Sequence, residues 1–233
     1  MIEDPFAGSK SSARAKSAYV PVGKGATKRR VLGINSSAWF QRDPKAMVYT
    51  AAKYKFVAKM LEGSERVLEV GCGDGFGTPI VAQQVKALEG IDFYKPHIEE
   101  ARHNVVLPNL TFHSGDFLDG NEAWRGAFDG IYALDVLEHV DPEQEERFLK
   151  TILVCLDPDG VFICGMPTLA SQAYASEYNK AAHINCQHPA QITATLKKYF
   201  KAVFSFGMND EMLHTGFDMM RQYQINLCAG VSE

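Results

Sequence analysis

The sequence has no long uninterrupted run of apolar residues. None of its apolar stretches approaches the roughly 18 residues of a membrane-spanning helix, and its first residues contain no apolar segment typical of secretion signals. The five cysteines are odd in number and show no paired spacing, so a disulfide framework is not indicated. We therefore expect a cytoplasmic protein with reduced thiols and no membrane role.

The glycine spacing of a dinucleotide-binding turn is also missing. Glycines stand at positions 71, 73, 75 and 77, whereas that fingerprint has glycines at its first, third and sixth positions. Counted from Gly71, the sixth position is Phe76, and counted from Gly73 it is Thr78. NAD binding is therefore not expected. Closely spaced glycines still indicate a tight turn whose backbone can lie against a ligand.

Acidic residues follow two of the expected strands. Asp92 ends a strand at about residues 87–91 and stands 21 positions after Gly71, which is the spacing of a carboxylate that binds a ribose diol. The alternative is that Asp92 caps the helix that begins near Pro96. Asp116 follows a third strand at residues 110–114. The sequence therefore indicates a nucleoside site other than a dinucleotide site.

Two motifs resemble those of known enzymes. Glu69 followed by the glycine run resembles motif I of class I S-adenosylmethionine-dependent methyltransferases. The run 135–140, which reads DVLEHV, resembles the signature of ubiquinone-biosynthesis-like O-methyltransferases and their small-molecule relatives. The turn 157–160 before an apolar strand is similar to the L-x-P-G-G turn of that group, with Asp159 where glycine is usual. Together these marks cover residues 64–166, the cofactor half of such a domain.

This resemblance implies a fold and a cofactor. The fold is α/β, a doubly wound Rossmann-like sheet of seven strands whose last strand is antiparallel, and the cofactor is S-adenosylmethionine. By the same resemblance Asp116 meets the adenine amino group and Phe117 packs on the ring, although a capping aspartate and a core phenylalanine stay open as alternatives. The implied cofactor-binding residues are Glu69, Gly71, Cys72, Gly73, Gly75, Asp92, Phe93, Asp116, Phe117 and Asp135.

Charge is unevenly distributed along the chain. Residues 1–30 carry seven lysines and arginines against two acidic residues, a net of +5, whereas the whole chain has a net charge of −4. We expect residues 1–33 to form a flexible basic arm and residues 34–233 a single domain. A lid for an anionic acceptor is the alternative role of the arm. The acidic remainder of the chain disfavours nucleic acid as a partner.

Two polar segments beyond the cofactor half are expected to bind the acceptor. Residues 167–188 form a long polar and aromatic loop, and residues 209–217 form a polar turn; such segments often carry function. Both also resemble stretches of bacterial methyltransferases of surface-saccharide biosynthesis. A helix is expected between Asp43 and Leu61 and another at about residues 189–199, with final strands near 202–208 and 220–228.

The histidines are the candidates for a general base, which is helpful when a hydroxyl is methylated. His183 ranks first, His214 second and His139 third, and Tyr174, Tyr178 and Asn185 are expected to position the acceptor. No metal site is predicted, because His183, Cys186 and His188 have an irregular spacing. A divalent cation held by Asp135, Glu138 and His139 is the minority alternative.

The leading hypothesis is a methyltransferase that acts on a small, possibly anionic acceptor. A hydroxyl of a saccharide or sugar nucleotide is the expected site of methylation. The alternatives are an O-methyltransferase of a quinone or phenol precursor and a non-catalytic subunit that binds S-adenosylmethionine. A base-amine of nucleic acid is disfavoured, because those enzymes place an Asp/Asn-Pro-Pro-aromatic motif where this chain has Asp135 to Glu138. The oligomeric state does not follow from the sequence.

Overall fold

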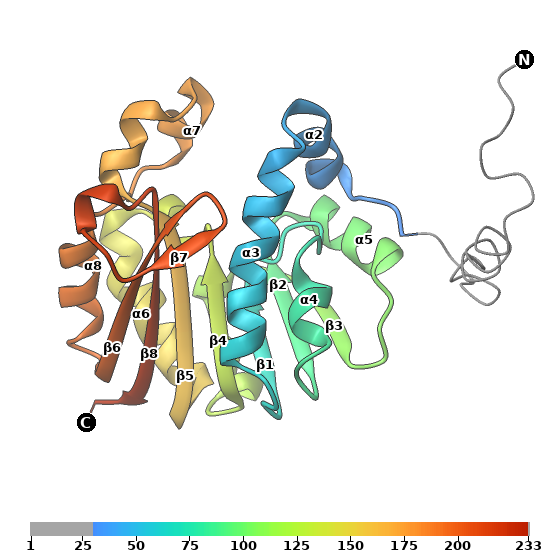
Figure 1. Ribbon diagram of the computed structural model, residues 1–233. Coiled ribbons are helices and arrows are strands. Elements are labelled where there is room, and N and C mark those ends of the chain that lie inside the picture. The colour runs from blue at the N-terminus through green and yellow to red at the C-terminus, as the bar shows by residue number, and fades with distance from the viewer. Residues whose placement is uncertain (1–29, 233) are drawn as a thin grey trace, which may run out of the picture. The chain divides into compact units, whose positions relative to one another are not determined.

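One mixed β-sheet organises the part of the chain that the computed structural model describes, residues 30–232. Within that range eight strands are hydrogen-bonded in the order β3-β2-β1-β4-β5-β8-β6-β7 (Figure 1). Most of the expected basic arm lies outside the described residues, so the division into an arm, 1–33, and a domain, 34–233, stays a prediction. The strands are β1 (Val67–Val70), β2 (Leu88–Asp92), β3 (Leu110–Ser114), β4 (Phe128–Leu134), β5 (Leu156–Pro167), β6 (Phe200–Asn209), β7 (Met212–His214) and β8 (Tyr223–Val231).

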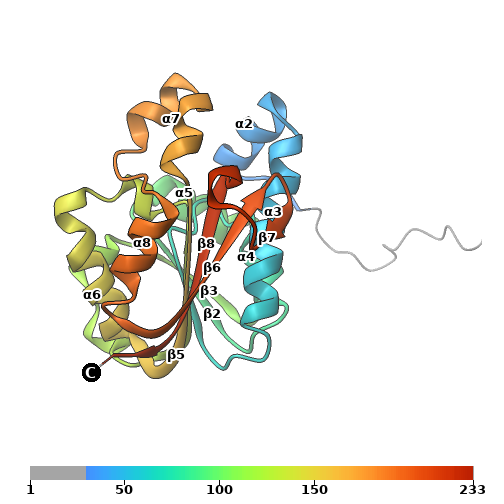
Figure 2. The ribbon, with the colours of Figure 1, turned by 60° about the vertical axis from the view of Figure 1, so that its left-hand side comes forward.

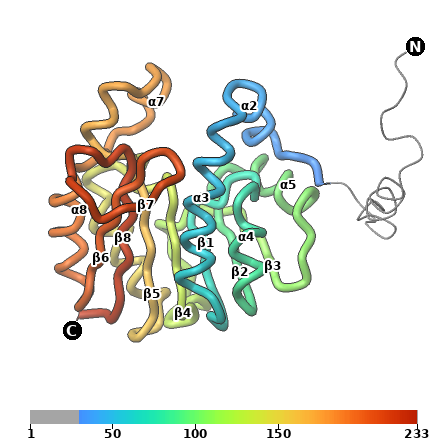
Figure 3. The backbone as a smooth tube through the Cα atoms, in the orientation of Figure 1, coloured from blue at the N-terminus to red at the C-terminus, as the bar shows by residue number. Residues whose placement is uncertain are grey.

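The first five strands run parallel and the end of the chain runs against them. β1 pairs in parallel with β2 and β4, and β4 pairs in parallel with β5. β8 is antiparallel to both β5 and β6 and lies between them (Figure 3). The expected doubly wound α/β fold with an antiparallel last strand is therefore confirmed, but the sheet has eight strands within the described residues rather than the expected seven.

Helices cover both faces of the sheet (Figure 2). α3 and α4 lie on one face, and α6 and α8 lie on the other. None of the helices within residues 30–232 is long and apolar enough to cross a membrane. The helices are α2 (Ile34–Arg42), α3 (Lys45–Met60), α4 (Thr78–Ala82), α5 (Lys95–Asn104), α6 (Glu145–Cys155), α7 (Glu177–Ala182) and α8 (Pro189–Leu196).

The alternation of side chains along the central strands produces a core on each face. Successive residues of a strand point to opposite faces, so in β4 Ile131 packs with Phe148 of α6 and Ile192 of α8. Its neighbour Tyr132 packs instead with Val57 of α3. Because both faces are apolar, β1 and β4 are almost fully buried. Their carboxyl ends are therefore held rigidly at one edge of the sheet.

The two segments expected to be an irregular loop and a polar turn both contain regular structure. The polar turn 209–217 contains the short strand β7, which pairs with β6 through a two-residue loop. Asp210 starts that loop with φ = 44°, a conformation that aspartate tolerates better than most residues. The loop 167–188 contains a 3₁₀ helix, η5 (Leu169–Tyr174), and α7. Ser176 caps α7 by accepting a hydrogen bond from the backbone of Asn179, a local signal that the aromatic content of the segment obscured.

Candidate active site

A large cavity opens at the carboxyl ends of β1, β2 and β4, where open α/β sheets hold their ligands. Its volume is about 2030 Å³, above the ~300–1,000 Å³ of a pocket for one drug-sized molecule. The cavity therefore has room for a cofactor and an acceptor together. It is lined by residues of α2, α3, the glycine turn, α5, η1 (Phe117–Asp119), η3 (Leu137–His139), η5, α7 and η6 (Asp218–Met220).

The glycine turn forms the floor of this cavity. Gly71 has φ = 76°, and a Cβ atom there would lie 2.3 Å from Val136 Cγ2, so no larger residue fits. Gly73 has φ = 54°, and nothing lies within 4 Å of the Cβ position. This combination leaves open space directly above the backbone of the turn. The turn therefore fits a ligand that lies against it, as the sequence motif requires.

Asp92 stands at the carboxyl end of β2 beside the turn. One of its carboxylate oxygens accepts a hydrogen bond from the backbone N–H of Gly73 at 3.0 Å, and the other accepts from that of Tyr94 at 2.8 Å. Asp92 also lines the cavity, so its carboxylate borders the space next to the glycine turn. The side chain of Asp92 thus joins the glycine turn to the carboxyl end of β2.

Glu69 lies beneath the glycine turn rather than in the cavity. Its side chain is buried and accepts a hydrogen bond of 2.8 Å from the hydroxyl of Tyr54 in α3. Burial raises the pKa of Glu69 above its ordinary value, although the bond from Tyr54 opposes the shift. Glu69 therefore ties the turn to α3, and a direct contact with a cofactor, which the resemblance implied, has no counterpart in the cavity lining.

The expected adenine-binding residues line the far side of the turn. Asp116 is exposed and caps η1 by accepting a hydrogen bond from the backbone N–H of Leu118 at 2.9 Å. Phe117 is 7% exposed and packs edge-on against Phe148, so its ring offers only a small surface to the cavity. Phe93 is 79% exposed and also lines the cavity, which makes it the more available ring for stacking.

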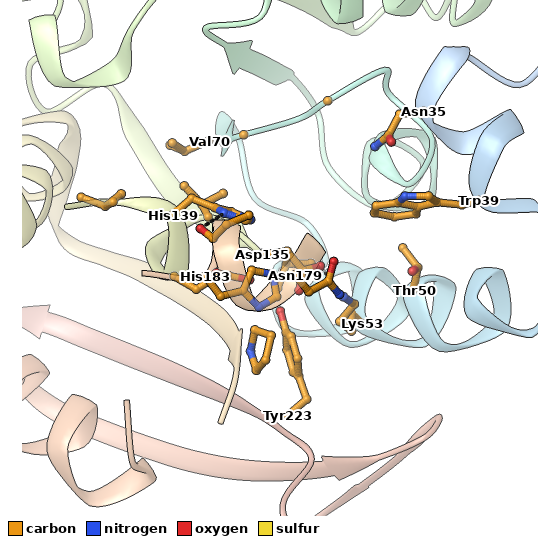
Figure 4. A pocket seen from close by; sticks show the side chains of 18 of the residues that line it. Asn35, Trp39, Thr50, Lys53, Val70, Asp135, His139, Asn179, His183 and Tyr223 are labelled. Carbon is orange, nitrogen blue, oxygen red and sulfur yellow. Dashed lines mark hydrogen bonds and ion pairs between the residues drawn. The ribbon is translucent and has the colours of Figure 1, made fainter. Parts of the chain in front are cut away.

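A helix that the sequence analysis did not identify holds the other wall. In α2, Ser36 makes two hydrogen bonds to the buried carboxylate of Asp74 in the glycine turn, from its hydroxyl at 2.6 Å and from its backbone N–H at 2.7 Å. Asn35 and Trp39 of the same helix line the cavity (Figure 4). Phe40 is exposed and lies outside the lining. The sequence signal was present in Ser36 and Asp74, but 38 residues separate them.

Asp135 has an unusual backbone and a buried partner. It is a non-glycine residue with φ = 57° at the end of β4, and its carboxylate is paired with the ammonium of Lys53. The side chain of Lys53 is 3% exposed, and its ammonium lies 4.8 Å from the ring centre of Tyr49 and 4.6 Å from that of Tyr223. Such aromatic faces stabilise a buried cation. α3 thereby fixes the direction of Asp135 in the cavity (Figure 4).

Two histidines from distant segments meet beside Asp135. The rings of His139 in η3 and His183 after α7 are 5.0 Å apart between centroids (Figure 4). Nδ1 of His139 lies 3.0 Å from the carbonyl oxygen of Ala182, and Nδ1 of His183 lies 3.0 Å from Oε1 of Gln172. Burial, followed by the neighbouring His139, lowers the pKa of His183. Both effects favour the neutral form of the His183 imidazole.

Glu138 lies next to these two histidines. It is fully buried, and neither carboxylate oxygen has a hydrogen-bond partner among residues 30–232. Burial raises its pKa well above the ordinary value, and the nearby Asp135 raises it further. One ligand atom each from Glu138, His139 and His183 lie within 4.8 Å of one another. This group of three could not be predicted from residue spacing, because His183 follows His139 by 44 positions.

The other expected catalytic and acceptor-binding residues divide into two sets. Tyr174 and Tyr178 line the rim of the cavity and are 93% and 77% exposed. Asn185 is buried outside the lining, where its amide donates to Glu145 at 2.8 Å. His214 lies on β7, also outside the lining, and its Nδ1 accepts from the backbone of Gly216. The fold therefore brings His139 and His183 to the cavity and leaves Asn185 and His214 away from it.

Comparisons with known proteins agree with this geometry. Residues 67–160 match the family model of the methyltransferase domain. The chain is 32% identical over 146 residues to an uncharacterized RNA methyltransferase of Listeria monocytogenes, a match covering 59% of this chain and 31% of that protein. It is 31% identical over 117 residues to the ubiquinone biosynthesis O-methyltransferase of Haemophilus ducreyi, covering 47% and 48%. The chain thus spans half or less of the length of these two relatives.

A solved structure shares the fold. The N-methyltransferase NodS from Bradyrhizobium japonicum, determined in complex with S-adenosylhomocysteine, superposes with a TM-score of 0.58 at 17% identity. The superposition covers 82% of this chain and 87% of that chain. The relatives named here act on different acceptors, according to their names, so the acceptor of this chain has to be argued from its own cavity.

Proposed function

We propose that this chain, which contains a class I S-adenosylmethionine-dependent methyltransferase domain, methylates a hydroxyl group of a small polar acceptor. The observation that supports a hydroxyl is the group formed by Glu138, His139 and His183 at the cavity wall. A hydroxyl is a weak nucleophile until its proton is removed or its oxygen is coordinated. A neutral amine has a free lone pair and needs no such group.

S-adenosylmethionine, when bound, supplies a methyl group on a positively charged sulfur. The chain's own residues bind and orient the reactants. The backbone at Gly71 and Gly73 leaves room for the cofactor, and the carboxylate of Asp92 accepts hydrogen bonds from its ribose. Asp116 and Phe93 line the same cavity, which supports assigning the adenine ring to them. Such alignment can supply ~7–11 kcal/mol of a bimolecular barrier.

The rim of the cavity supports a saccharide-like acceptor. Tyr174 and Tyr178 present exposed rings, and Gln172 and Asn179 add amide groups from η5 and α7. Aromatic faces with adjacent amides suit a molecule that has apolar C–H faces and several hydroxyls. A quinone or phenol precursor is the second candidate, favoured by the DVLEHV signature and by the Haemophilus relative.

Calorimetry and a methylation assay test this function. The full chain is titrated with S-adenosylmethionine, S-adenosylhomocysteine and NAD, and then incubated with sugar nucleotides, phenols, amines and RNA, with the gain of one methyl group read by mass spectrometry. We expect both cofactor forms to bind, NAD not to bind, and a hydroxyl compound to be methylated. Binding of NAD alone would overturn the cofactor assignment. Methylation only of amines or RNA would overturn the acceptor class, and cofactor binding without any methylation would favour the non-catalytic alternative.

A further inference from the structure

We infer that Glu138, His139 and His183 bind a divalent transition-metal cation that activates the acceptor hydroxyl. This inference rests on the proposed function and names the device that carries it out. The three residues offer one carboxylate oxygen and two imidazole nitrogens whose positions fall within 4.8 Å of one another. Catalytic metal sites commonly use three protein ligands of this kind and keep a further position for water or substrate.

Glu138 is buried without a hydrogen-bond partner among the described residues. A fully buried carboxyl group without a hydrogen-bond partner is costly to keep in a folded protein, whether it is ionised or protonated. Its two oxygens contact no hydrogen-bond donor in the described part of the chain, whereas the neighbouring Asp135 is paired with Lys53. A cation between Glu138 and the two histidines would give this carboxylate the partner that the surrounding residues do not supply.

The two imidazoles are each held by an oxygen behind the ring. Each histidine has its Nδ1 within 3.0 Å of an oxygen that can only accept, the carbonyl of Ala182 for His139 and Oε1 of Gln172 for His183. An Nδ1–H that donates to either oxygen leaves Nε2 of that ring as the nitrogen available to a cation. Metal-binding histidines are held in the same way by an acceptor behind the ring. Gln172 and the carbonyl of Ala182 thus position the ligands without contacting the cation.

Hydrogen bonds hold the segment that carries His183 against the segment that carries Glu138 and His139. The backbone N–H of Asn185 donates to the carbonyl oxygen of Glu138 at 2.9 Å, and the amide of Asn185 is held by Glu145 of α6. These bonds hold the segment after α7 against η3, and they thereby position His183 two residues earlier in that segment. Asn185, expected to contact the acceptor, instead holds a ligand segment in position.

The ligand types indicate which cations fit. The two imidazole nitrogens suit Fe²⁺, Co²⁺ and Zn²⁺, and the carboxylate also suits Mn²⁺, whereas Mg²⁺ and Ca²⁺ prefer sites made of oxygen alone. The cation would bind the acceptor oxygen and lower the pKa of its hydroxyl. The proton leaves to water, the oxygen forms a bond to the methyl carbon, and the carbon–sulfur bond breaks with its electron pair passing to sulfur. His183 then acts as a ligand rather than as the general base that the sequence suggested.

Direct cation binding tests the inference. The full chain is freed of metal with EDTA, desalted, and titrated with MnCl₂ and CoCl₂ by calorimetry, with the visible absorption of bound Co²⁺ as a second signal. We expect one cation per chain. His139→Ala and His183→Ala should weaken binding by at least about 100-fold, and Gln172→Ala by the ~10–100-fold typical of residues behind a ligand. His188→Ala, which changes a histidine outside the cavity lining, should bind as the wild type does.

The result that would overturn the inference is wild-type protein that binds neither Mn²⁺ nor Co²⁺. Equal binding by wild type, His139→Ala and His183→Ala would overturn it as well. Cofactor affinity, measured in the same samples, separates this failure from failure of the proposed function. Chain that binds S-adenosylmethionine and methylates a hydroxyl compound in EDTA keeps the function and loses the cation. In that case a kcat decrease in His183→Ala would restore the general-base role.

Discussion

Glu69 shows how a buried charge can make stability depend on pH. Burial raises its pKa in the folded state above the value of about 4.3 in an unfolded chain. Between these two pKa values the unfolded chain has released the proton while the folded chain retains it. The free energy of unfolding therefore falls as pH rises from about 4 towards neutrality.

We expect Glu69→Gln to remove this dependence, because glutamine does not ionise and its amide oxygen can still accept from Tyr54. Urea unfolding of both proteins at about pH 4 and pH 7 measures it. The stability of the wild type relative to Glu69→Gln should decrease from the lower to the higher pH. An unchanged or increasing difference would mean that Glu69 is ionised in the folded protein.

Asp92→Ala is the residue-scale test of the cofactor site. The carboxylate accepts from Gly73 and Tyr94 and faces the cavity, so its removal takes away bonds to the ribose and loosens the turn. Hydrogen bonds to a charged group contribute ~1.5–3 kcal/mol, which predicts an affinity for S-adenosylmethionine at least about tenfold weaker by calorimetry. Asp119→Ala, an exposed aspartate of η1 outside the lining, is the control and should bind normally. Equal affinities for the two variants would remove Asp92 from the site.

Single residues could be predicted from the sequence where one local motif fixes both backbone and position. Gly71, Gly73, Asp92 and Asp135 all reach the cavity lining, because each ends a strand or belongs to the turn that follows one. Their roles toward a ligand stay predictions. Glu69 lies in the same motif, yet strand alternation buries it. A motif shows the order of the residues, but it does not show whether each side chain points into the cavity or into the core.

The helix α2 forms one wall of the cavity, and Ser36 joins it to Asp74 in the glycine turn. Ser36→Ala removes the hydroxyl that donates to Asp74 at 2.6 Å, a bond to a carboxylate in a buried setting. We expect weaker attachment of α2 and therefore a lower apparent affinity for S-adenosylmethionine, by roughly tenfold if the loss is near 1.4 kcal/mol. Calorimetry measures the affinity.

Ser37→Ala supplies the matched control for this change. Ser37 belongs to the same helix, but its hydroxyl donates to the backbone of Leu32 and not to the turn. Its replacement should leave the affinity for S-adenosylmethionine unchanged. Equal weakening in both variants would indicate a general loss of α2 rather than loss of its contact with Asp74.

Elements with strong periodicity could be predicted, and those built by long-range contacts could not. β3 has the expected bounds, and α3 occupies the expected helical segment. α2 has a weak pattern of its own and is stabilised by Asp74, far along the chain. β7 and α7 are short and depend on a tight loop and a serine cap, which composition does not reveal. The contact between His139 and His183 depends on α7, so it could not be predicted from the sequence either.

The uneven charge along the whole chain leads to a prediction about the basic arm, residues 1–33. Most of the arm lies outside the described residues. Residues 1–30 carry a net of +5 on a chain of net −4. If the arm attracts an anionic acceptor, its removal should raise the KM for that acceptor while cofactor affinity stays the same. The increase should be larger at low salt, since exposed charges are screened over about 10 Å at 0.1 M.

Steady-state kinetics of the full chain and of a chain lacking residues 1–30 provide the measurement, at low and high ionic strength. A neutral acceptor serves as the control, because its KM should not respond to removal of the arm. Identical kinetics at low ionic strength would assign the arm no part in acceptor capture.

The position of β8 has a consequence for how the protein reaches its native state. β8 separates β5 from β6, although β6 precedes it in the sequence. Until β8 inserts, the inner edges of both neighbours expose unpaired peptide groups, which promote aggregation. Such pairings between distant segments also form slowly. Because Tyr223 at the start of β8 lines the cavity, a kinetic intermediate without this strand would be both prone to aggregation and unable to form the complete cavity.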